Sequence, residues 1–499
     1  MDTVTSPGLI KFEDAGAADI EAAMQESAKA FIIYRRLSLK QRANFLRAIA
    51  VEIESLGDEL LHIAAAETNL SLERLAGERT RTLFQLRSYA DACEHGDHLD
   101  IRIDHSKTGK PDLRKMMFPL GPVLVFGAAN FPFAYSTAGG DTACALAAGC
   151  PVIVKAHPAH SNTSELVARA IHRAVELFHL PQGLFIHLHG ASNSVGQALV
   201  EHPVVTAVGF TGSFAGGTQL AQWAAQRKVP VPVFAEMSSI NPVFILPAKL
   251  SLDSAETAEK IAASVVLGVG QFCTNPGLLV VIDNDDASKF ILDLGQRINQ
   301  TMPGVMLNPG IFKNYVEKRA NALAQPEVEM SAVSADAPGL NQGAPTLAVT
   351  TAQVFMANPL LHSEVFGPYT LVVKCSDENE MLEVARSLEG QLTMTLIATE
   401  EEIIRHQVLA ETLQFNCGRF ILNGVPTGVE VCLSMQHGGP FPATTDSRFT
   451  SVGADGIKRF VRPITFQNWP DHLLPAELRN ENAGGLWRTV NNKKTKDSL

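Results

Sequence analysis

The sequence predicts an α/β protein made of two successive units, each built around a largely parallel sheet. From Pro122 onward, apolar runs of Val, Ile, Leu and Phe alternate with helical stretches across short connections, and a second alternating set begins near Leu250. Continuous apolar runs are typical of parallel strands that helices cover on both faces. The first set therefore indicates a doubly wound sheet, and a chain of 499 residues is long enough for several domains.

The N-terminal hundred residues lack this alternation and predict helices instead. Apolar residues recur at helical spacing over 18–31, 39–56 and 57–67, with Ser38 placed to begin the second helix. Residues 101–117 then alternate around a polar turn at 106–110, a pattern that predicts a projecting two-stranded arm. We expect this arm to make subunit contacts in a homo-oligomer, either a dimer or a tetramer.

The two alternating sets give the expected order of strands. In the first unit the strands are PVLVFG, PVIVKA, LFIHLHG, VTAVGFTG and VPVFAEM; in the second they are LLVVID, PTLAVT, YTLVVKC, LTMTLIAT and RFILNG. We expect the first unit to span 1–249 and the second 250–445. The segment 446–499 is expected to return to the first unit and the arm and to end in a frayed tail. Residues 425–453 predict an ordered loop over a cleft.

Composition and charge exclude several classes of protein. The chain has 41 Lys and Arg against 52 Asp and Glu, a net charge of -11, and no clustered basic residues, so nucleic acid is an unexpected partner. Its apolar windows are too short to cross a bilayer, and its first residues lack the pattern of a secretory signal. We therefore expect a cytoplasmic location and no membrane partner.

The seven cysteines show neither a paired framework nor the CxxC spacing of a zinc site, so the sequence predicts free thiols and no metal. Cys273 stands out because it lies in LGVGQFCTNPG, a glycine-rich loop between a helix and a strand, where a thiol is positioned for nucleophilic attack. Buried packing is the alternative for any single cysteine, and we assign that role to the other six.

Glu236 and Asn130 are further candidates for catalysis. Glu236 ends the apolar strand VPVFAE, where partial burial raises the pKa of a carboxyl group toward that of a general base; a solvated strand end is the alternative. Asn130, in FGAANFP, offers a side-chain amide to an oxyanion, although Asn before Phe-Pro is also suited to a turn.

Residues suited to a phosphate-containing ligand lie at the ends of the neighbouring strands. Lys155 ends PVIVKA, and the turn GFTGSFAGG carries Gly212, Ser213 and Gly217 at the start of a helix, where backbone N–H groups can meet a phosphate. The GxGxxG pattern is absent. A solvated lysine and an ordinary glycine-rich turn remain the alternatives for these residues.

Taken together and in this order, FGAANFP, PVIVKAHP, GFTGSFAGG, FAEMSSINP, GQFCTNPG, HSEVFGP and FILNG resemble the aldehyde dehydrogenase superfamily over nearly the whole chain. The resemblance implies a Rossmann-type cofactor domain, a second α/β catalytic domain and a small oligomerisation arm. It also implies oxidation of an aldehyde to a carboxylic acid with NAD(P)⁺ through a thiohemiacetal and a thioester on Cys273.

The same resemblance implies a role for each site residue. Asn130 and the backbone N–H of Cys273 would form the oxyanion hole, and Glu236 would be the base for hydrolysis of the thioester. The cofactor residues would be Lys155 and His157 at the adenine ribose, Gly212, Ser213 and Gly217 at the pyrophosphate, and Glu364 and Phe366 at the nicotinamide ribose and ring. Pro158 replaces a ribose-binding carboxylate of many relatives that prefer NAD, so we expect NADP to be accepted at least as well as NAD.

Long stretches around residues 126–167 and 423–453 resemble the branch that oxidises α-ketoglutaric semialdehyde, a branch that also includes broader NADP-dependent aldehyde dehydrogenases. A carboxylate-bearing substrate needs a cationic partner, for which Arg448 and Arg419 are the candidates, each with a structural alternative. Phe131 and Phe272 would line the tunnel and would equally suit uncharged medium-chain aldehydes. A CoA-acylating enzyme and a non-catalytic protein of the same fold remain alternatives, which the presence of Glu236 and Cys273 disfavours.

Overall fold

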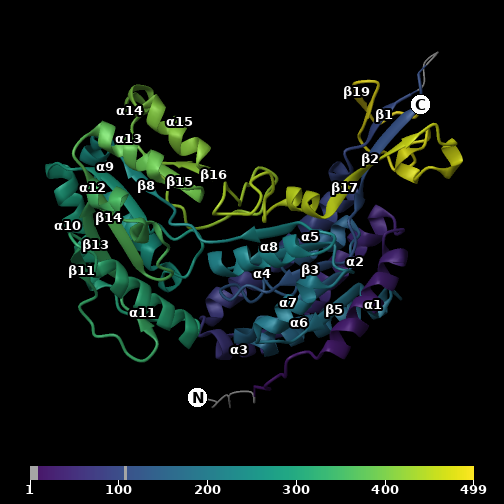
Figure 1. Cartoon of the computed structure of the whole chain (residues 1–499), viewed down its shortest axis with the longest axis horizontal. Helices are drawn as coiled ribbons and strands as arrows, with labels where there is room; N and C mark the ends of the chain where they lie inside the picture. Colours follow the sequence, from purple (N-terminus) through teal and green to yellow (C-terminus); the bar gives the residue numbers. More distant parts are fainter. Residues whose placement is uncertain (1–8, 106–109) are drawn as a thin grey trace.

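The computed structural model describes residues 9–105 and 110–499. Two sheet-centred lobes lie side by side, and a smaller sheet projects from one of them (Figure 1). Most of the predicted arm turn at 106–110 lies outside the described residues. Within the described part of the chain, no helix is long and apolar enough to cross a membrane.

Four long helices form the N-terminal region, one more than the sequence assigned. Their bounds are α1 (Ala17–Tyr34), α2 (Leu39–Glu54), α3 (Gly57–Thr68) and α4 (Leu72–His95). The first three confirm the predicted stretches within a few residues, and Ser38 caps α2 by accepting a hydrogen bond from the backbone N–H of Gln41 at 3.3 Å. Helix α4 is the unassigned one, and its N-terminal half lines the functional site.

The first sheet has the strand order β5-β4-β3-β6-β7 and is parallel throughout. Its strands are β3 (Val123–Phe126), β4 (Val152–Lys155), β5 (Phe185–Leu188), β6 (Ala207–Thr211) and β7 (Val233–Glu236), and its helices are α5 (Gly140–Ala148), α6 (Ser161–Leu177), α7 (Asn193–Glu201) and α8 (Phe214–Gln226). Apolar side chains from α2 to α6 and from the C-terminal end of α1 cover one face of the sheet, and those from the N-terminal half of α1, α7 and α8 cover the other. The chain order reverses between β3 and β6, so a crevice is expected at their carboxyl ends.

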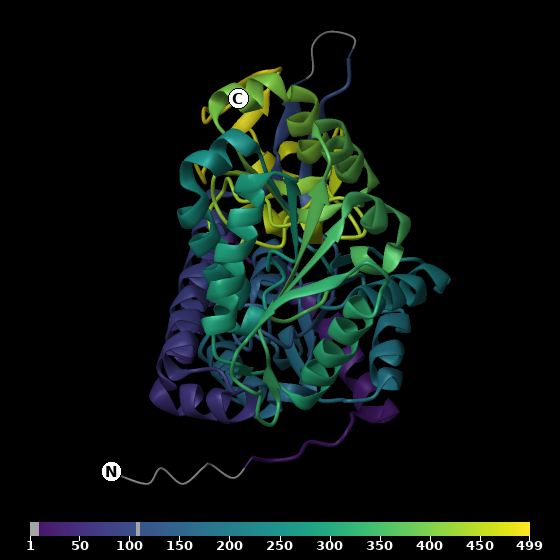
Figure 2. The same ribbon diagram turned by 90° about the vertical axis from the view of Figure 1, so that its left-hand side faces the viewer.

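The second sheet has the order β11-β13-β14-β9-β8-β15-β16, and only its edge strand β11 runs antiparallel to its neighbour. Figure 2 shows this sheet in front, with helices on either side of it. Its strands are β8 (Val243–Ile245), β9 (Leu278–Ile282), β11 (Glu329–Val333), β13 (Thr346–Thr351), β14 (Tyr369–Cys375), β15 (Gln391–Ile397) and β16 (Cys417–Leu422), and β10 (Gly304–Val305) pairs separately with β12 (Gln342–Gly343). Strand β8 precedes the predicted boundary at residue 249, so that boundary falls after the start of the second sheet.

Helices pack on both faces of the second sheet around separate apolar clusters. They are α9 (Pro247–Val266), α10 (Asp285–Gln300), α11 (Pro309–Leu323), α12 (Ala352–Ala357), α13 (Glu378–Ser387), α14 (Glu400–Arg405) and α15 (Gln407–Phe415), with short 3-10 helices η4 (Leu267–Gly270) and η5 (Pro359–His362).

The arm is a five-stranded sheet and not the two-stranded ribbon that the sequence predicts. Strands β1 (Arg102–Asp104) and β2 (Leu113–Pro119) are joined by β17 (Val461–Gln467), β18 (Arg488–Val490) and β19 (Lys493–Thr495) in the order β17-β2-β1-β18-β19. The expectation of a frayed end is wrong, because β18 and β19 form a hairpin over Asn491 and Asn492, whose φ angles of 46° and 66° suit a tight turn.

Residues 423–453, which we call the bridging loop, run between the two lobes (Figure 1). Met237 donates its backbone N–H to the Ala443 carbonyl at 2.8 Å on one side, and Gly390 donates to the Phe441 carbonyl at 3.3 Å on the other. The predicted ordered loop is therefore confirmed, and it touches the end of β7, where Glu236 lies.

Candidate active site

Cys273 lies on the loop between η4 and β9, and tight backbone packing fixes this loop. Gly270 has a φ of 64°, and a Cβ built there would meet the Gly367 carbonyl at 2.3 Å, so only glycine fits. The backbone carbonyl of Cys273 accepts a hydrogen bond from Asn241 Nδ2 at 2.8 Å. The loop therefore holds the thiol at a fixed position between the two lobes.

Glu236 ends β7 and is 3% exposed, so its carboxylate must find partners inside the protein. His437 of the bridging loop brings its Nε2 to 3.0 Å from Glu236 Oε1 and 3.6 Å from Cys273 Sγ. Ser451 Oγ donates to Glu236 Oε2 at 2.6 Å. The thiol, the imidazole and the carboxylate are thus within range for proton exchange.

His437 and Ser451 are site residues that the sequence analysis missed. Both lie in irregular structure, where no strand end or helix start marks them, and His437 is 164 residues away from Cys273 in the chain. Their backbones bond to each other, since Ser451 N–H donates to the His437 carbonyl at 2.9 Å. The only available signal was a histidine within the quoted stretch HGGPFPATTDSR.

The three groups shift one another's protonation. Burial would raise the pKa of Glu236, but the charge of His437 and the hydrogen bonds from His437 and Ser451 outweigh burial and lower it. Burial, together with the negative charge of Glu236, raises the pKa of the Cys273 thiol well above its usual value. At neutral pH the site therefore holds an ionised carboxylate beside a protonated thiol.

Asn130 follows β3 and reaches the same point from the first lobe. Its Nδ2 donates to the Gln271 carbonyl at 3.1 Å, two residues before Cys273. The second hydrogen of this amide is available for a substrate oxygen. The structure thus brings the three predicted catalytic residues, Cys273, Glu236 and Asn130, to one place.

Two clefts reach Cys273, which among residues 9–105 and 110–499 is the only one that lines both. One is a cavity of about 450 Å³, which we call the cofactor cleft; it runs from Asn130 past Glu236 to Glu364. The other is a cavity of about 640 Å³, which we call the substrate cleft; it is lined by α4, by the Cys273 loop and by Val429 of the bridging loop. Such a thiol can meet one molecule in each cleft at once.

The cofactor cleft continues into a further cavity of about 460 Å³ beside β4, because both are lined by Gly127, His157, Phe210 and Gly216. The N-terminus of α8 faces this junction, and Ser213 caps it by accepting from the Gly216 N–H at 3.2 Å. A Cβ at Gly212 would meet the Phe210 ring at 2.5 Å. The joined cavities and the open helix end fit an elongated dinucleotide with its pyrophosphate at the turn.

Gly217 has a different role from the one the resemblance implies. It does not line either cavity, and a Cβ there would lie 2.6 Å from the Met237 side chain. This glycine permits close packing of α8 against β7. We therefore interpret it as a structural residue.

Lys155 and His157 line the far cavity as expected, but their charges differ from expectation. Burial lowers the pKa of His157 to about 3, so its imidazole is neutral and adds no attraction for a phosphate. Burial also lowers the pKa of Lys155, and the nearby Asp14 carboxylate partly offsets this. Lys155 is thus the charged member of the pair.

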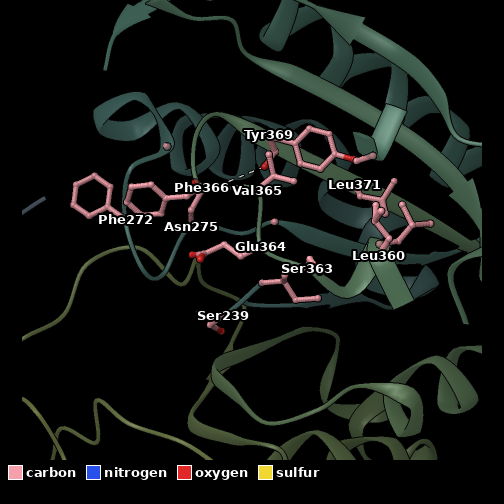
Figure 3. Close-up of a pocket in the computed structure, with 15 residues that line it drawn as sticks. Ser239, Phe272, Asn275, Leu360, Ser363, Glu364, Val365, Phe366, Tyr369 and Leu371 are labelled. Carbon is pink, nitrogen blue, oxygen red and sulfur yellow. Dashed lines mark hydrogen bonds between the residues drawn. The ribbon is translucent and has the colours of Figure 1, made fainter. Parts of the chain in front are cut away.

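Glu364 and Phe366 lie on the segment between η5 and β14 and line the cofactor cleft near Cys273. Figure 3 shows them in the small pocket that they share with Phe272 and Ser239. Burial raises the pKa of Glu364 to about 7, against the opposing effects of Ser238 and Lys318. Their placement matches the nicotinamide end that the resemblance implies.

The four substrate candidates have different surroundings. Phe131 and Phe272 line the substrate cleft as an edge-to-face pair with ring centroids 5.7 Å apart. Arg448 does not line the substrate cleft. Its side chain is 80% exposed and pairs with Asp446 at 2.6 Å, which is the structural role weighed as the alternative for this residue. Arg419, on β16, is half-buried and donates to the carbonyls of Gly428 and Pro426.

Four of the remaining cysteines are buried, and burial raises the pKa of Cys93, Cys144 and Cys150 to about 11. These thiols are protonated and inert, as their packing role predicts. All seven cysteines are free, since none forms a disulfide.

Comparisons with known proteins agree with this geometry. The sequence matches the aldehyde dehydrogenase family over residues 2–455. It is 48% identical to α-ketoglutaric semialdehyde dehydrogenase 2 of Azospirillum brasilense over 94% of this chain and 91% of that protein. It is 44% identical to the α-ketoglutaric semialdehyde dehydrogenase of Acinetobacter baylyi, over 96% and 92% of the two chains.

Among solved structures, a 1-pyrroline-5-carboxylate dehydrogenase from Thermus with bound NAD superposes with a TM-score of 0.78 at 20% identity, covering 91% of this chain and 86% of that one. The chain therefore belongs to the aldehyde dehydrogenase family and has its fold. It is an NAD(P)-dependent oxidoreductase that converts an aldehyde to the carboxylic acid.

Proposed function

We propose that this enzyme oxidises α-ketoglutaric semialdehyde to α-ketoglutarate in the cytoplasm, with Cys273 as the nucleophile, Glu236 as the base and Asn130 in the oxyanion hole. One observation carries the assignment of roles: Cys273 is the residue common to the two clefts and lies beside the buried Glu236 and His437. The two relatives named above support the choice of substrate, and the unpaired thiols favour a reducing compartment.

The first step is attack of Cys273 Sγ on the aldehyde carbon. Because its pKa is raised, the thiol must lose its proton during the attack, and this is the proton that the overall reaction releases to solvent. The carbonyl oxygen gains the negative charge, which the Asn130 amide and the Cys273 backbone N–H stabilise. The product of this step is a thiohemiacetal.

When bound in its cleft, the nicotinamide supplies the acceptor of the hydride that the thiohemiacetal carbon loses. The carbon is thereby oxidised to a thioester. Glu236 then takes a proton from a water molecule, whose oxygen attacks the thioester carbon and releases the carboxylic acid and the Cys273 thiol. The sum is one aldehyde, one water and one NAD(P)⁺ giving one acid, one NAD(P)H and one proton.

We propose that both NADP and NAD serve as the cofactor. Pro158 provides no carboxylate to repel a 2′-phosphate, and Lys155 lines the same cavity with a positive charge. His157 contributes no charge, and Asp14 lies close enough to Lys155 to oppose an added phosphate. The absence of repulsion therefore supports acceptance of NADP more than selection for it.

The experiment is a steady-state comparison of kcat/KM for α-ketoglutaric semialdehyde and hexanal with each cofactor, followed by NAD(P)H absorbance. We expect the semialdehyde to be preferred and the rate to be independent of CoA. A clear preference for hexanal supports the second candidate, an enzyme for uncharged medium-chain aldehydes, which the aromatic lining of the substrate cleft by Phe131, Phe272 and Tyr135 favours.

A further inference from the structure

One face of helix α4 forms a wall of the substrate cleft. Arg74, Gly77, Glu78 and Arg81 line the cavity together with Cys273. Gly77, Glu78 and Arg81 follow Arg74 by three, four and seven positions, a spacing that places all four residues on one face of a helix. Two guanidinium groups and one carboxyl group thus face the same cavity as the reactive thiol.

Arg74 is already occupied by contacts within the protein. Its Nη1 lies 2.8 Å from Glu78 Oε2, and its guanidinium stacks over Phe131 at 4.5 Å and Phe272 at 5.5 Å. The other oxygen of Glu78 accepts hydrogen bonds from the backbone N–H groups of Phe133 and Ala134, each at 2.9 Å. The charge of Arg74 is therefore balanced without a substrate.

Arg81 lacks such a balance. It donates through Nη1 to the Val429 carbonyl, and its buried Nε has no hydrogen-bond partner. Among residues 9–105 and 110–499, no carboxylate lies within ion-pair distance of it. An uncompensated guanidinium in a partly buried cleft is costly unless an anion completes it.

A second guanidinium converges on the same backbone. Arg419 donates to the Gly428 carbonyl at 2.7 Å, next to the Val429 carbonyl that Arg81 contacts, and its buried Nε is also without a partner. Tyr135 lines the same cleft, and burial raises the pKa of its hydroxyl; the charge of Glu236 adds to that rise, whereas Arg81 opposes it. The hydroxyl therefore remains a hydrogen-bond donor.

We propose that Arg81 binds the distal carboxylate of the aldehyde substrate in the substrate cleft, and that Arg419 positions this site by fixing the Gly428–Val429 backbone. The proposal rests on the proposed function, and it replaces Arg448 as the cationic partner. A guanidinium offers two parallel N–H donors to a carboxylate. Arg81 can therefore hold the carboxylate end of a short aldehyde whose carbonyl carbon lies at Cys273.

The test compares two substrates of similar length, α-ketoglutaric semialdehyde and pentanal, in Arg81→Leu. Loss of a charge-assisted hydrogen bond should lower kcat/KM for the semialdehyde about 10- to 100-fold and leave that for pentanal unchanged or higher. Arg448→Leu is the matched control, because that arginine is exposed and paired outside the cleft; it should change neither value. Equal losses for both substrates in Arg81→Leu would overturn the proposal.

Arg81→Gln guards against a folding defect, because its amide can still donate to the Val429 carbonyl while the charge is lost. It should show the same selective loss. Glutarate should inhibit pentanal oxidation by the wild-type enzyme and should inhibit the Gln variant at least about tenfold more weakly. Unchanged glutarate inhibition would also overturn the proposal.

The proposed function fails in a different way. If the wild-type enzyme prefers pentanal to the semialdehyde, the substrate assignment is wrong whatever the variants do. If the wild-type enzyme prefers the semialdehyde and Arg81→Gln keeps that preference, the substrate stands and Arg81 is not its partner. For Arg419→Leu we expect a smaller selective loss, which Arg419→Lys should partly restore.

Discussion

At the scale of single residues, the site is defined by how protons are shared around Cys273. The thiol is protonated at neutral pH because burial and Glu236 raise its pKa, whereas His437 and Ser451 keep Glu236 ionised. In the proposed mechanism, attack on the aldehyde is therefore coupled to loss of the thiol proton. Each member of this group has a separable effect that kinetics can measure.

Replacement of Cys273, the proposed nucleophile, gives the first prediction. Cys273→Ala should abolish turnover, because hydride leaves only from the adduct that the sulfur forms. NAD(P)H production should fall below the detection limit while fluorescence titration still shows cofactor binding. Substantial activity in the folded variant would remove Cys273 from the mechanism.

The second prediction separates formation of the thioester from its hydrolysis. Glu236→Gln should form up to one equivalent of NAD(P)H per active site in a rapid phase and then turn over slowly, since hydrolysis lacks its base. Stopped-flow absorbance measures both phases. A folded variant that binds cofactor but shows no burst would mean that Glu236 acts before the thioester forms.

The third prediction concerns pH. As the proposed base, Glu236 must be a carboxylate, so we expect activity to be lost as pH falls through its pKa, which contacts with His437 and Ser451 hold below the usual value. His437→Phe removes the larger contact and leaves burial dominant, so the acidic limb of kcat should move to higher pH by about one unit or more. Ser451→Ala should move it less, in the same direction. A shift toward lower pH would contradict this account.

The sequence was sufficient for residues whose positions follow from regular structure. Glu236 ends a strand, Asn130 follows one and Cys273 precedes one, so their convergence at sheet edges was foreseeable. The positions of His437, Ser451 and Arg81 were not foreseeable, because the first two lie in a loop and Arg81 lies on α4, whose apolar pattern is weak. Arg448 was placed by its loop alone, and the loop directs it outward to Asp446.

At the scale of elements, glycines determine how closely the bridging loop packs on the second sheet. A Cβ at Gly418 of β16 would meet the Gly438 carbonyl at 2.1 Å, and one at Gly390 would meet the Pro440 carbonyl at 2.3 Å. Gly439, with a φ of 156°, approaches the Gln391 carbonyl equally closely. These contacts fix the backbone at residues 438–440, directly after His437, and therefore fix the position of the His437 imidazole.

A fourth prediction follows from this packing. Gly418→Ala should push the bridging loop away from β16 and displace His437, lowering kcat about tenfold or more, because small misplacements of catalytic groups are costly. Affinity for NAD(P)H, measured by fluorescence, should change little, since Gly418 does not line the cofactor cleft. Gly484→Ala is the comparison, because a Cβ there would come no closer than 3.4 Å to its neighbours and Gly484 lines neither cleft.

Elements were predictable where their apolar pattern was strong. Every strand of the two large sheets except β8 and β11 was found from sequence, as were helices α1 to α3. Helix α4 was missed because Glu78, Thr82 and Gln85 are polar but buried, which obscures its apolar periodicity. Strand β8 is three residues long and directly precedes a helix, and the β18–β19 hairpin is too polar to indicate a strand.

At the scale of the whole molecule, the free edge of the second sheet is apolar. Within the described residues strand β16 pairs only with β15, and Phe415, Phe420 and Leu422 near it are 79%, 40% and 54% exposed. An unpaired apolar edge invites association with another chain. This surface supports the predicted homo-oligomer.

The fifth prediction tests that surface. Leu422→Arg should shift the enzyme to a smaller species, measured by size-exclusion chromatography with light scattering, because a charge would be buried at the interface. Leu340→Arg is the control, since Leu340 is 89% exposed and lies far from β16 in the sequence. An unchanged molar mass for Leu422→Arg would place the interface elsewhere.

Cys273 lines two separate clefts, and in the proposed mechanism each cleft serves one reactant. This separation affects the order in which the substrate and the cofactor bind and leave. In the mechanism proposed above, the aldehyde enters and the acid leaves along α4, while the cofactor exchanges along the ends of β3, β4 and β6. Neither the substrate nor the cofactor then has to pass through the cleft that holds the other. The acid can therefore dissociate while NAD(P)H is still bound, and NAD(P)H can be exchanged for NAD(P)⁺ while the thioester remains on Cys273. The order of product release then depends on the two dissociation rates, because neither product blocks the other.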